Sequence, residues 1–441
     1  MIMAYGLLLI CITLQLVTSQ ARLEFADNST NRDQRNILLY QSLFMPPRRH
    51  QPNSNTNSNM EEEGAATSRI ENMACRALDG TTGLCYSKSE CTELDGRSVG
   101  LCDDDTGEDG PICCIVEKSC RNITKQAISY FVNPSYPDRD RLGSFCDFRI
   151  DITNKNVCQV RLDLEEFSLL GPHTTMGICR SDRFVAMTSL PNGIGISELC
   201  GENAGQHLYV PVDATVGSAS VSLMVMTSGA KAYQWHIRAT QIDCRTTPEL
   251  VAPNGCLQYH TDLSGNIRSF NYDPADSGHY QSNLDYAICI QRSPNTCRVE
   301  FNQVENSVFW INTADGMYLE EGVGRAGAAA CDLSSHDYLY IPGGRDGSDG
   351  QPGGAFSEPT ADKFCGRSLS GLAVTETADR MRSGYVLDPP DNNTLASTVT
   401  SYAAGPIVLR FHSDDIIEPD QELGFDIMYR QLGTGCIRSL K

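Results

Sequence analysis

Short runs in which apolar and polar residues alternate dominate the chain after residue 119. Every second position in these runs tends to be apolar, which is the period of a half-buried β-strand. Examples are QVRLDLEEF (159–167), SLMVMTS (222–228), DYLYI (337–341), VLRFHS (408–413) and FDIMYR (425–430). Turn residues separate the runs, and nothing shows a sustained helical period. The pattern predicts an all-β protein built as sandwiches or barrels.

The first 72 residues follow a different pattern. An apolar stretch at 6–17 is too short to span a bilayer comfortably, so residues 1–19 are predicted to be a secretory signal peptide. Residues 20–72 are largely polar and partly of low complexity. Such a composition cannot bury enough apolar surface to offset the entropy of ordering, and we predict a disordered tail. Arg48-Arg49 is a weak signal for processing within this tail.

The formal net charge of -20, from 55 acidic and 35 basic residues, narrows the classes of partner. Nucleic acid is disfavoured because neutralising phosphates needs clustered lysine and arginine, and electrostatic attachment to anionic membranes is disfavoured as well. No stretch after the signal is long and apolar enough to span a membrane. Glycosylation sequons begin at Asn28, Asn122 and Asn392. These features predict a secreted, extracellular glycoprotein.

The chain contains 19 cysteines, of which Cys11 lies in the predicted signal peptide. The other 18 form an even set, as expected for full pairing in an oxidising compartment. Six of them lie between residues 75 and 114, where Gly and Asp fill the gaps. This indicates a small module held by disulfides rather than by a core. Zinc is disfavoured because CxxC pairs with companion histidines are absent, and spacing alone leaves the pairing open.

The remaining twelve cysteines fall into two sets of six, and the sequence around them repeats. The first set is Cys120, Cys146, Cys158, Cys179, Cys200 and Cys244, and the second is Cys256, Cys289, Cys297, Cys331, Cys365 and Cys436. NVCQVRL around Cys158 parallels NTCRVEF around Cys297, and Cys200-Gly201 parallels Cys365-Gly366. We infer two tandem copies of one six-cysteine unit.

The spacing of the first six cysteines, C-x9-C-x5-C-x10-C-x10-CC with DGTTGLC early, resembles the arthropod clip domain. This resemblance covers residues 73–118. It implies three disulfides, Cys75–Cys113, Cys85–Cys102 and Cys91–Cys114.

The segments HDYLYIPGG, KFCGRSLSG, IVLRFHSDD and ELGFDIMY closely resemble the CUB domain, a compact extracellular β-sandwich. In the first copy, NPSYP before Cys146 is similar to a segment of the same family. The resemblance implies the disulfides Cys120–Cys146, Cys179–Cys200, Cys256–Cys289 and Cys331–Cys365. For the cysteines left over, the simplest proposal is Cys158–Cys244 and Cys297–Cys436. We therefore predict two disulfide-bonded CUB-type sandwiches in tandem, at 119–246 and 247–441, after the clip-like module.

The CUB resemblance also implies a calcium site in the second copy. Many CUB domains bind Ca²⁺ through a Glu, the Asp of a YD pair and the Asp of a late SD pair. Carried over residue by residue, these are Glu320 or Glu321, Asp337 and Asp414. Carboxylate oxygens from three loops suit Ca²⁺, although the same acids are also compatible with independent, solvated side chains. The first copy keeps Asp182 but lacks the late SD pair, and we predict no calcium there.

No catalytic site is predicted. A serine protease needs a Ser with a His base and an orienting Asp, but no GDSGG-like loop is present, and neither is the HExxH helix of zinc proteases. We interpret the chain as a secreted, non-catalytic protein that binds an extracellular protein of unknown identity. The clip resemblance associates it with proteolytic or immune cascades. The alternatives are a structural component of a matrix or lumenal lining, and a non-catalytic regulator of clip-type serine proteases.

Overall fold

A computed structural model describes twelve segments of the chain, and the fold below refers to them. They are residues 73–102, 110–188, 198–217, 219–273, 278–304, 307–311, 326–327, 337–346, 362–366, 369, 398–416 and 422–433. All of them belong to one compact unit, residues 65–441. The predicted signal peptide and tail, with Asn28 and Arg48-Arg49, lie outside the described residues.

Residues 73–116, here called the cysteine-rich module, form a small sheet. Its strands are β1 (Ala74–Arg76), β2 (Thr82–Tyr86), β3 (Arg97–Leu101) and β4 (Ile112–Ile115), in the order β1-β2-β4-β3. The short helix α2 (Lys88–Glu93) follows β2 and begins at a capping box, in which Ser87 and Glu90 satisfy each other's backbone N–H groups. This module has a small apolar cluster of its own, and disulfides supplement it.

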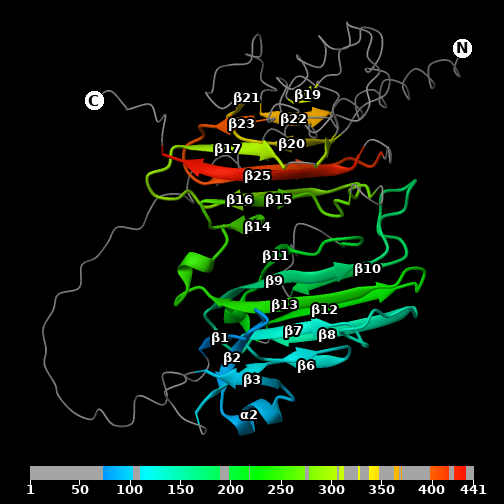
Figure 1. Ribbon diagram of the computed structural model, residues 1–441, viewed down its shortest axis with the longest axis vertical. Helices are drawn as coiled ribbons and strands as arrows, with labels where there is room; N and C mark the ends of the chain where they lie inside the picture. The colour runs from blue at the N-terminus through cyan, green and yellow to red at the C-terminus, as the bar shows by residue number, and fades with distance from the viewer. Residues whose placement is uncertain are drawn as a thin grey trace, which may run out of the picture. The chain divides into compact units, whose positions relative to one another are not determined.

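Residues 117–243, here called sandwich 1, form two sheets (Figure 1). The strands are β5 (Glu117–Lys118), β6 (Asn122–Thr124), β7 (Ile128–Val132), β8 (Ser144–Asp151), β9 (Val157–Ser168), β10 (Arg183–Thr188), β11 (Gln206–Pro211), β12 (Ser220–Thr227) and β13 (Gln234–Asp243). One sheet has the order β10-β12-β8-β6 and the other β11-β9-β13-β7-β5. Two 3-10 turns, Ala214–Val216 and Pro248–Leu250, lie before β12 and after β13.

Residues 256–432, here called sandwich 2, also form two main sheets. The strands are β14 (Cys256–His260), β15 (Ser264–Arg268), β16 (Asp285–Ile290), β17 (Arg298–Gln303), β18 (Phe309–Trp310), β19 (Ala326–Gly327), β20 (Tyr338–Tyr340), β21 (Gly344–Asp346), β22 (Lys363–Gly366), β23 (Thr398–Ser401), β24 (Ile407–His412) and β25 (Gly424–Leu432). Their orders are β14-β16-β24-β20-β22-β19 and β15-β25-β17-β23-β21, and β18 pairs with β25.

Alternation along the strands builds the core, as the sequence pattern predicts. In β12 the residues Val221, Leu223 and Val225 are fully buried, while their neighbours in sequence are partly exposed. Trp235 on β13 is fully buried among the apolar side chains of the same sandwich. Because each strand contributes every second residue to the core, the all-β prediction is confirmed at the level of individual strands.

Seven disulfides join described cysteines. They are Cys75–Cys113, Cys85–Cys102, Cys91–Cys114, Cys120–Cys146, Cys158–Cys244, Cys179–Cys200 and Cys256–Cys289. Each of these pairs is one that the sequence analysis gives. Cys297 and Cys365 are also disulfide-bonded. Their expected partners, Cys436 and Cys331, lie outside the described residues.

The outward face of β9, β13, β7 and β5 carries a charged histidine. His236 on β13 is 7% exposed and stacks between the rings of Tyr130 and Tyr136, at centroid distances of 4.6 and 4.7 Å. Its Nδ1 lies 3.3 Å from a carboxylate oxygen of Glu165. Its Nε2 lies 3.6 Å from a carboxylate oxygen of Glu117, and this second distance suits an ion pair but is too long for a hydrogen bond. Burial opposes the positive charge, but the two glutamates outweigh it and raise the pKa of His236 to about 9.

Candidate functional site

Two of the four predicted calcium ligands meet at one end of sandwich 2. Asp337 directly precedes β20, and Asp414 follows β24, the strand paired with β20. The backbone N–H of Asp414 donates to Asp337 Oδ1 at 2.6 Å, so antiparallel pairing of the two strands brings the two acidic residues together. These two predicted ligands, which are far apart in the sequence, therefore lie next to each other in the structure. Glu320 and Glu321 lie outside the described residues.

Asp337 is a buried acid, with 2% of its surface exposed. Its Oδ2 accepts a hydrogen bond of 2.6 Å from the hydroxyl of Tyr280, a residue that the sequence analysis did not single out. Tyr280 comes from the segment before β16, so three separate parts of sandwich 2 meet at this carboxylate. Asp414 is partly exposed, and its own Oδ1 accepts from the N–H of Ile416 at 2.8 Å. One acid is thus fixed in the interior while the other faces the surface.

The donor chemistry of this pair fits a hard cation. Ca²⁺ takes carboxylate and backbone oxygens from flexible loops, and a buried carboxylate is costly unless opposite charge or hydrogen bonds compensate it. Asp337 supplies the buried carboxylate, and Asp414 supplies a second carboxylate on the adjoining loop. The described half of the predicted set is therefore compatible with calcium.

Sandwich 1 also places a buried aspartate beside the loop that follows the paired strand, but that loop carries a serine in place of the second aspartate. Asp182 precedes β10 and is 1% exposed, and Ser228 follows β12, the strand paired with β10. The N–H and the hydroxyl of Ser228 both donate to Asp182 Oδ1 at 2.7 Å, and the N–H of Leu170 donates to Oδ2 at 3.1 Å. Protein donors therefore satisfy both oxygens of Asp182, as they do for Asp337, and the two sites differ in that Ser228 brings no second carboxylate.

Strand register makes the two ends directly comparable. Tyr338 is opposite His412 in sandwich 2, and Arg183 is opposite Met226 in sandwich 1, so Ser228 occupies the position of Asp414. A hydroxyl that closes the loop in sandwich 1 thus stands where sandwich 2 has a second carboxylate. This substitution is the physical basis for the predicted asymmetry in calcium binding.

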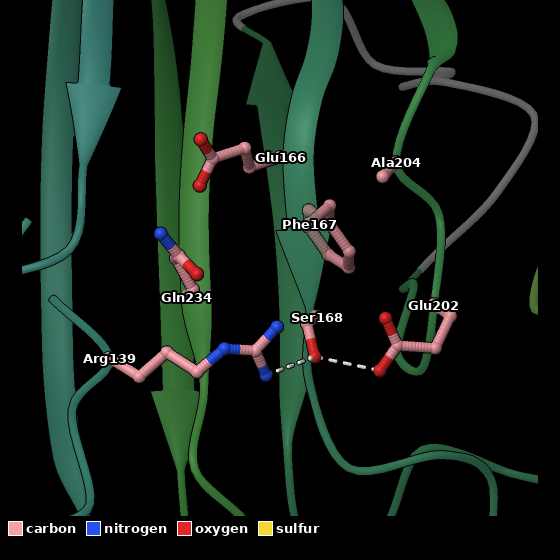
Figure 2. Close-up of a pocket in the computed structure, with 7 residues that line it drawn as sticks. All are labelled: Arg139, Glu166, Phe167, Ser168, Glu202, Ala204 and Gln234. Atoms are coloured by element: carbon pink, nitrogen blue, oxygen red, sulfur yellow. Dashed lines mark hydrogen bonds between the residues drawn. The ribbon is translucent and has the colours of Figure 1, made fainter. Parts of the chain in front are cut away.

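A shallow polar pocket lies near one end of sandwich 1 (Figure 2). Its lining residues include Arg139, Glu166, Ser168 and Glu202. Ser168 Oγ donates to Glu202 at 2.7 Å and accepts from Arg139 at 3.4 Å, and Lys231 forms an ion pair with Glu202 at 2.7 Å. The lining contains neither His nor Cys, so the serine hydroxyl has no nitrogen base within the pocket. These contacts are those of a structural network on the surface.

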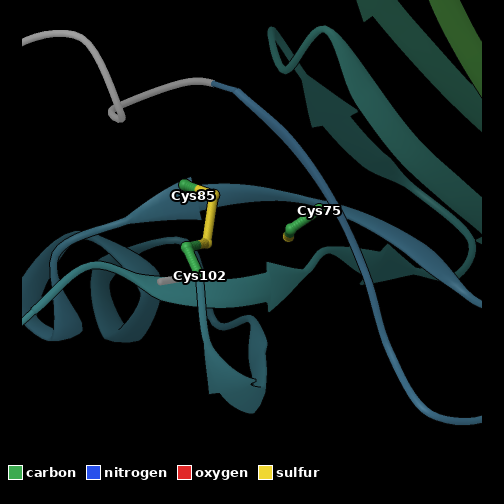
Figure 3. Close-up of side chains that lie close together, drawn as sticks. All are labelled: Cys75, Cys85 and Cys102. Carbon is green, nitrogen blue, oxygen red and sulfur yellow. A yellow bond between two sulfur atoms is a disulfide. The ribbon is translucent and has the colours of Figure 1, made fainter. Parts of the chain in front are cut away.

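The sulfurs of Cys75, Cys85 and Cys102 lie within 4.8 Å of one another in the cysteine-rich module. Figure 3 shows the bond between Cys85 and Cys102. Cys75 is bonded to Cys113. A cysteine ligates zinc as a thiolate, and sulfurs held in disulfides are not available as thiolates. The cluster is therefore a contact between two disulfides.

The remaining predicted sites divide between described and undescribed residues. Asn122, at the start of β6, is exposed, and its side-chain N–H donates to the carbonyls of Ser119 and Cys120. Asn392 lies outside the described residues, and glycosylation at the sequons stays a prediction. Within the part of the chain that the structure describes, no helix is long and apolar enough to cross a membrane.

A known protein family matches the part of the chain that forms sandwich 2. Residues 253–432 match the model of the animal CUB domain. The CUB1-EGF-CUB2 domains of rat MASP-1 are 14% identical, with a TM-score of 0.22, over 70% of this chain and 99% of that chain. The same domains of human MASP-1/3 are 13% identical, with a TM-score of 0.21, over 69% and 100%. The MASP-1 CUB2 domain bound to Ca²⁺ is 18% identical, with a TM-score of 0.21, over 27% and 98%.

No match was found among curated proteins. The family match spans β14 to β25 and includes both acids of the candidate site, Asp337 and Asp414. Residues 253–432 therefore match the CUB family, and this matched region is the one that holds the paired acids.

Proposed function

We propose that this chain is a secreted, non-catalytic protein that binds extracellular protein partners through its CUB-type sandwiches. CUB domains are extracellular protein-interaction modules, and one occupies residues 253–432. The disulfides and the net charge of -20 support an oxidising, extracellular setting. The proposed domain boundaries are 73–118, 119–246 and 247–441.

The main support for this proposal is the contact between Asp337 and Asp414 at one end of this domain. We propose that these residues, with Glu320 or Glu321, hold Ca²⁺. The ion would supply positive charge that links the loop before β20 to the loop after β24. Asp337 is already oriented by Tyr280, so binding would cost little reordering of that side chain. The ordered loops would then present a fixed surface to a protein partner.

Changing Asp414 to Ser tests this site, because it installs the residue that sandwich 1 has at the same register position. With calcium present, we expect chelation to lower the thermal midpoint of the wild-type chain by about 5 °C, since an ion that binds only the folded state stabilises it by mass action. The D414S variant should show no response to chelator. Differential scanning calorimetry with and without EGTA measures the thermal midpoints. Titration with CaCl2 alone measures calcium binding.

Asp415→Ser is the matched control, because Asp415 is the adjacent exposed acid. It should keep the full chelator response. A wild-type chain whose midpoint does not change on chelation would remove calcium from the proposal. It would leave the protein-binding role to a separate test.

That separate test uses the secreted wild-type chain as bait in its native extracellular fluid, with calcium or with EGTA. Recovery of a protease zymogen would support a role in a proteolytic cascade. Recovery only with insoluble matrix would support the structural alternative. Failure to retain any protein under either condition would contradict the binding role.

A further inference from the structure

Sandwich 1 and sandwich 2 meet where their edge strands β11 and β14 face each other. Gln258 donates to Gln206 Oε1 at 3.1 Å, and Gln206 Nε2 donates to the carbonyl of Ser269 at 3.1 Å. Gln159 on β9 bonds both the N–H and the carbonyl of Ala252, at 2.9 and 2.8 Å. All five residues are buried. Side-chain hydrogen bonds that water does not reach therefore join the two sandwiches here.

One histidine from each sandwich lies on this contact. His207 on β11 is 8% exposed, and its Nε2 accepts the backbone N–H of Tyr259 at 3.0 Å. His260, the last residue of β14, packs edge-on against the His207 ring at a centroid distance of 4.9 Å. These three residues are here called the histidine seam. A ring nitrogen can accept only when it carries no proton, so this contact requires a neutral His207.

The charged groups of sandwich 1 disfavour a proton on the seam. The guanidinium of Arg161 lies beside it, 3.3 Å from the hydroxyl of Tyr209. Asp163 is opposite His207 in the strand register and is the carboxylate that could favour a proton there. However, one of its oxygens pairs with Arg161 at 2.8 Å and the other with Arg238 at 3.1 Å. The two arginines therefore already neutralise this carboxylate.

The groups of sandwich 2 do not reverse this preference. Tyr429 on β25 faces His260 at a ring-centroid distance of 5.7 Å, and Asp262 is the carboxylate that favours a proton on His260. Asp262 is exposed, so water weakens its effect. Burial and Arg161 outweigh it and lower the pKa of His260 to about 4. Burial, Arg161 and the neighbouring His260 hold the pKa of His207 well below its ordinary value.

We propose that the histidine seam is an acid-sensitive joint, at which proton uptake by His207 and His260 separates sandwich 1 from sandwich 2. A protonated His207 would present an N–H to the N–H of Tyr259, so the bond between the sandwiches is lost. Two charged rings would also lie 4.9 Å apart and next to Arg161. Separation exposes both rings to water, where they take up protons as ordinary histidines do. The chain between β13 and β14 keeps the separated sandwiches attached.

The direction of the response follows from the pKa values. The closed seam holds both pKa values below 6.5, the ordinary value for histidine, so the open form binds more protons as the pH falls below 6.5. Each histidine that is protonated only in the open form raises the ratio of open to closed molecules about ten-fold per pH unit, and two raise it about 100-fold. His260 stops contributing near pH 4, where it is protonated in both forms.

Amide-resolved hydrogen–deuterium exchange on the full secreted chain tests the proposal, because His207 protects the Tyr259 N–H only while the seam is closed. After correction for the pH dependence of intrinsic exchange, the protection factor of this amide should fall by about 100-fold or more between pH 6.5 and pH 4.5. The amides of β12 should keep their protection. Small-angle X-ray scattering over the same range should show an increase in the maximum dimension.

The double variant His207→Gln with His260→Gln should abolish both changes, because a glutamine oxygen can still accept the Tyr259 N–H and does not titrate. Each single variant should halve the slope of the response on a logarithmic scale, so the test remains decisive where the double variant fails to fold. Circular dichroism verifies the folding of each variant. His173→Gln is the matched control, because it removes a histidine of sandwich 1 that lies outside the seam, and it should leave the response unchanged.

Three results would each overturn the proposal. The first is a wild-type protection factor that stays constant between pH 6.5 and pH 4.5. The second is a fall that the double variant shares with the wild-type chain. The third is an equal loss of protection in β12, which would show that the whole of sandwich 1 unfolds. The response should be the same in CaCl2 and in EGTA, because the seam contains neither Asp337 nor Asp414 and is independent of the proposed calcium site.

Discussion

Sandwich 1 is expected to lose about 3 kcal/mol of unfolding free energy between pH 6.5 and pH 9, because His236 must give up its proton in that interval. The ordinary pKa of histidine is 6.5, and the folded environment raises the pKa of His236 to about 9. Within this window the folded state binds a proton that the unfolded state has released. The stabilisation is complete below pH 6.5 and disappears as the pH rises through the folded pKa.

The physical cause is the pair of glutamates around a ring that water reaches poorly. Glu165 and Glu117 lie 3.3 and 3.6 Å from the two ring nitrogens, and the side chain of His236 is 7% exposed. Tyr130 and Tyr136 cover both faces of the ring, where they also favour a cation through their π-systems. Burial raises the pKa of each of these tyrosines to about 12, so neither titrates within the window.

Urea unfolding between pH 6 and pH 9.5 measures the effect, with His236→Gln as the reference. The buried Trp235 reports on sandwich 1, and a Trp310→Phe background removes the only other tryptophan signal. The stability difference between the wild-type chain and the glutamine variant should be largest near pH 6.5 and should shrink as the pH approaches 9. Parallel curves for the two proteins would show that His236 is not charged in the folded state.

The strands could be predicted from the sequence because their patterns are local. The runs at 159–167 and 425–430 lie inside β9 and β25, and the run at 337–341 contains β20. The family resemblances added most of the disulfide pairs, which depend on contacts far apart in the chain, and Cys158–Cys244 followed as the simplest pairing of the cysteines left over. Alternation alone could not have supplied them, because it fixes which side of a strand a residue faces but not which strand lies beside it.

The outward side of β12 shows where alternation carries no information. In SLMVMTS both the inward and the outward positions are largely apolar, so the run predicts a strand without revealing that its outer side lacks polar residues. Only the register with β8 and β10 shows that Met224 and Met226 join Phe145 and Val185. The charge of His236 was hidden for a similar reason, since Glu117 and Glu165 come from two other strands.

The candidate calcium site was partly predictable. The family's YD and SD pairs pointed to Asp337, which follows His336 in this chain, and to Asp414, and strand pairing brings these two residues together. Tyr280 was missed because it lies 57 residues before Asp337, and no local pattern marks a tyrosine whose hydroxyl faces a carboxylate. In sandwich 1 the absence of the late acid could be read from the sequence, but no pattern indicated that Ser228, at this position, donates to Asp182.

Replacing Asp182 by Ala should cost about 2–3 kcal/mol, independently of calcium. The carboxylate is 1% exposed and accepts from Leu170 N–H, Ser228 N–H and the Ser228 hydroxyl, so its removal takes the acceptor from three hydrogen bonds, of which the Ser228 donors can turn to water. Urea unfolding followed by Trp235 fluorescence should show this loss equally with CaCl2 and with EGTA. Ser228→Ala removes one donor and keeps the carboxylate, so it should cost only about 1 kcal/mol. A loss for D182A that matches S228A, or that changes on chelation, would contradict a carboxylate held by protein donors. The contrast with D414S separates two uses of one loop geometry, because the same position carries a hydroxyl that donates to Asp182 in sandwich 1 and a carboxylate, the proposed calcium ligand, in sandwich 2.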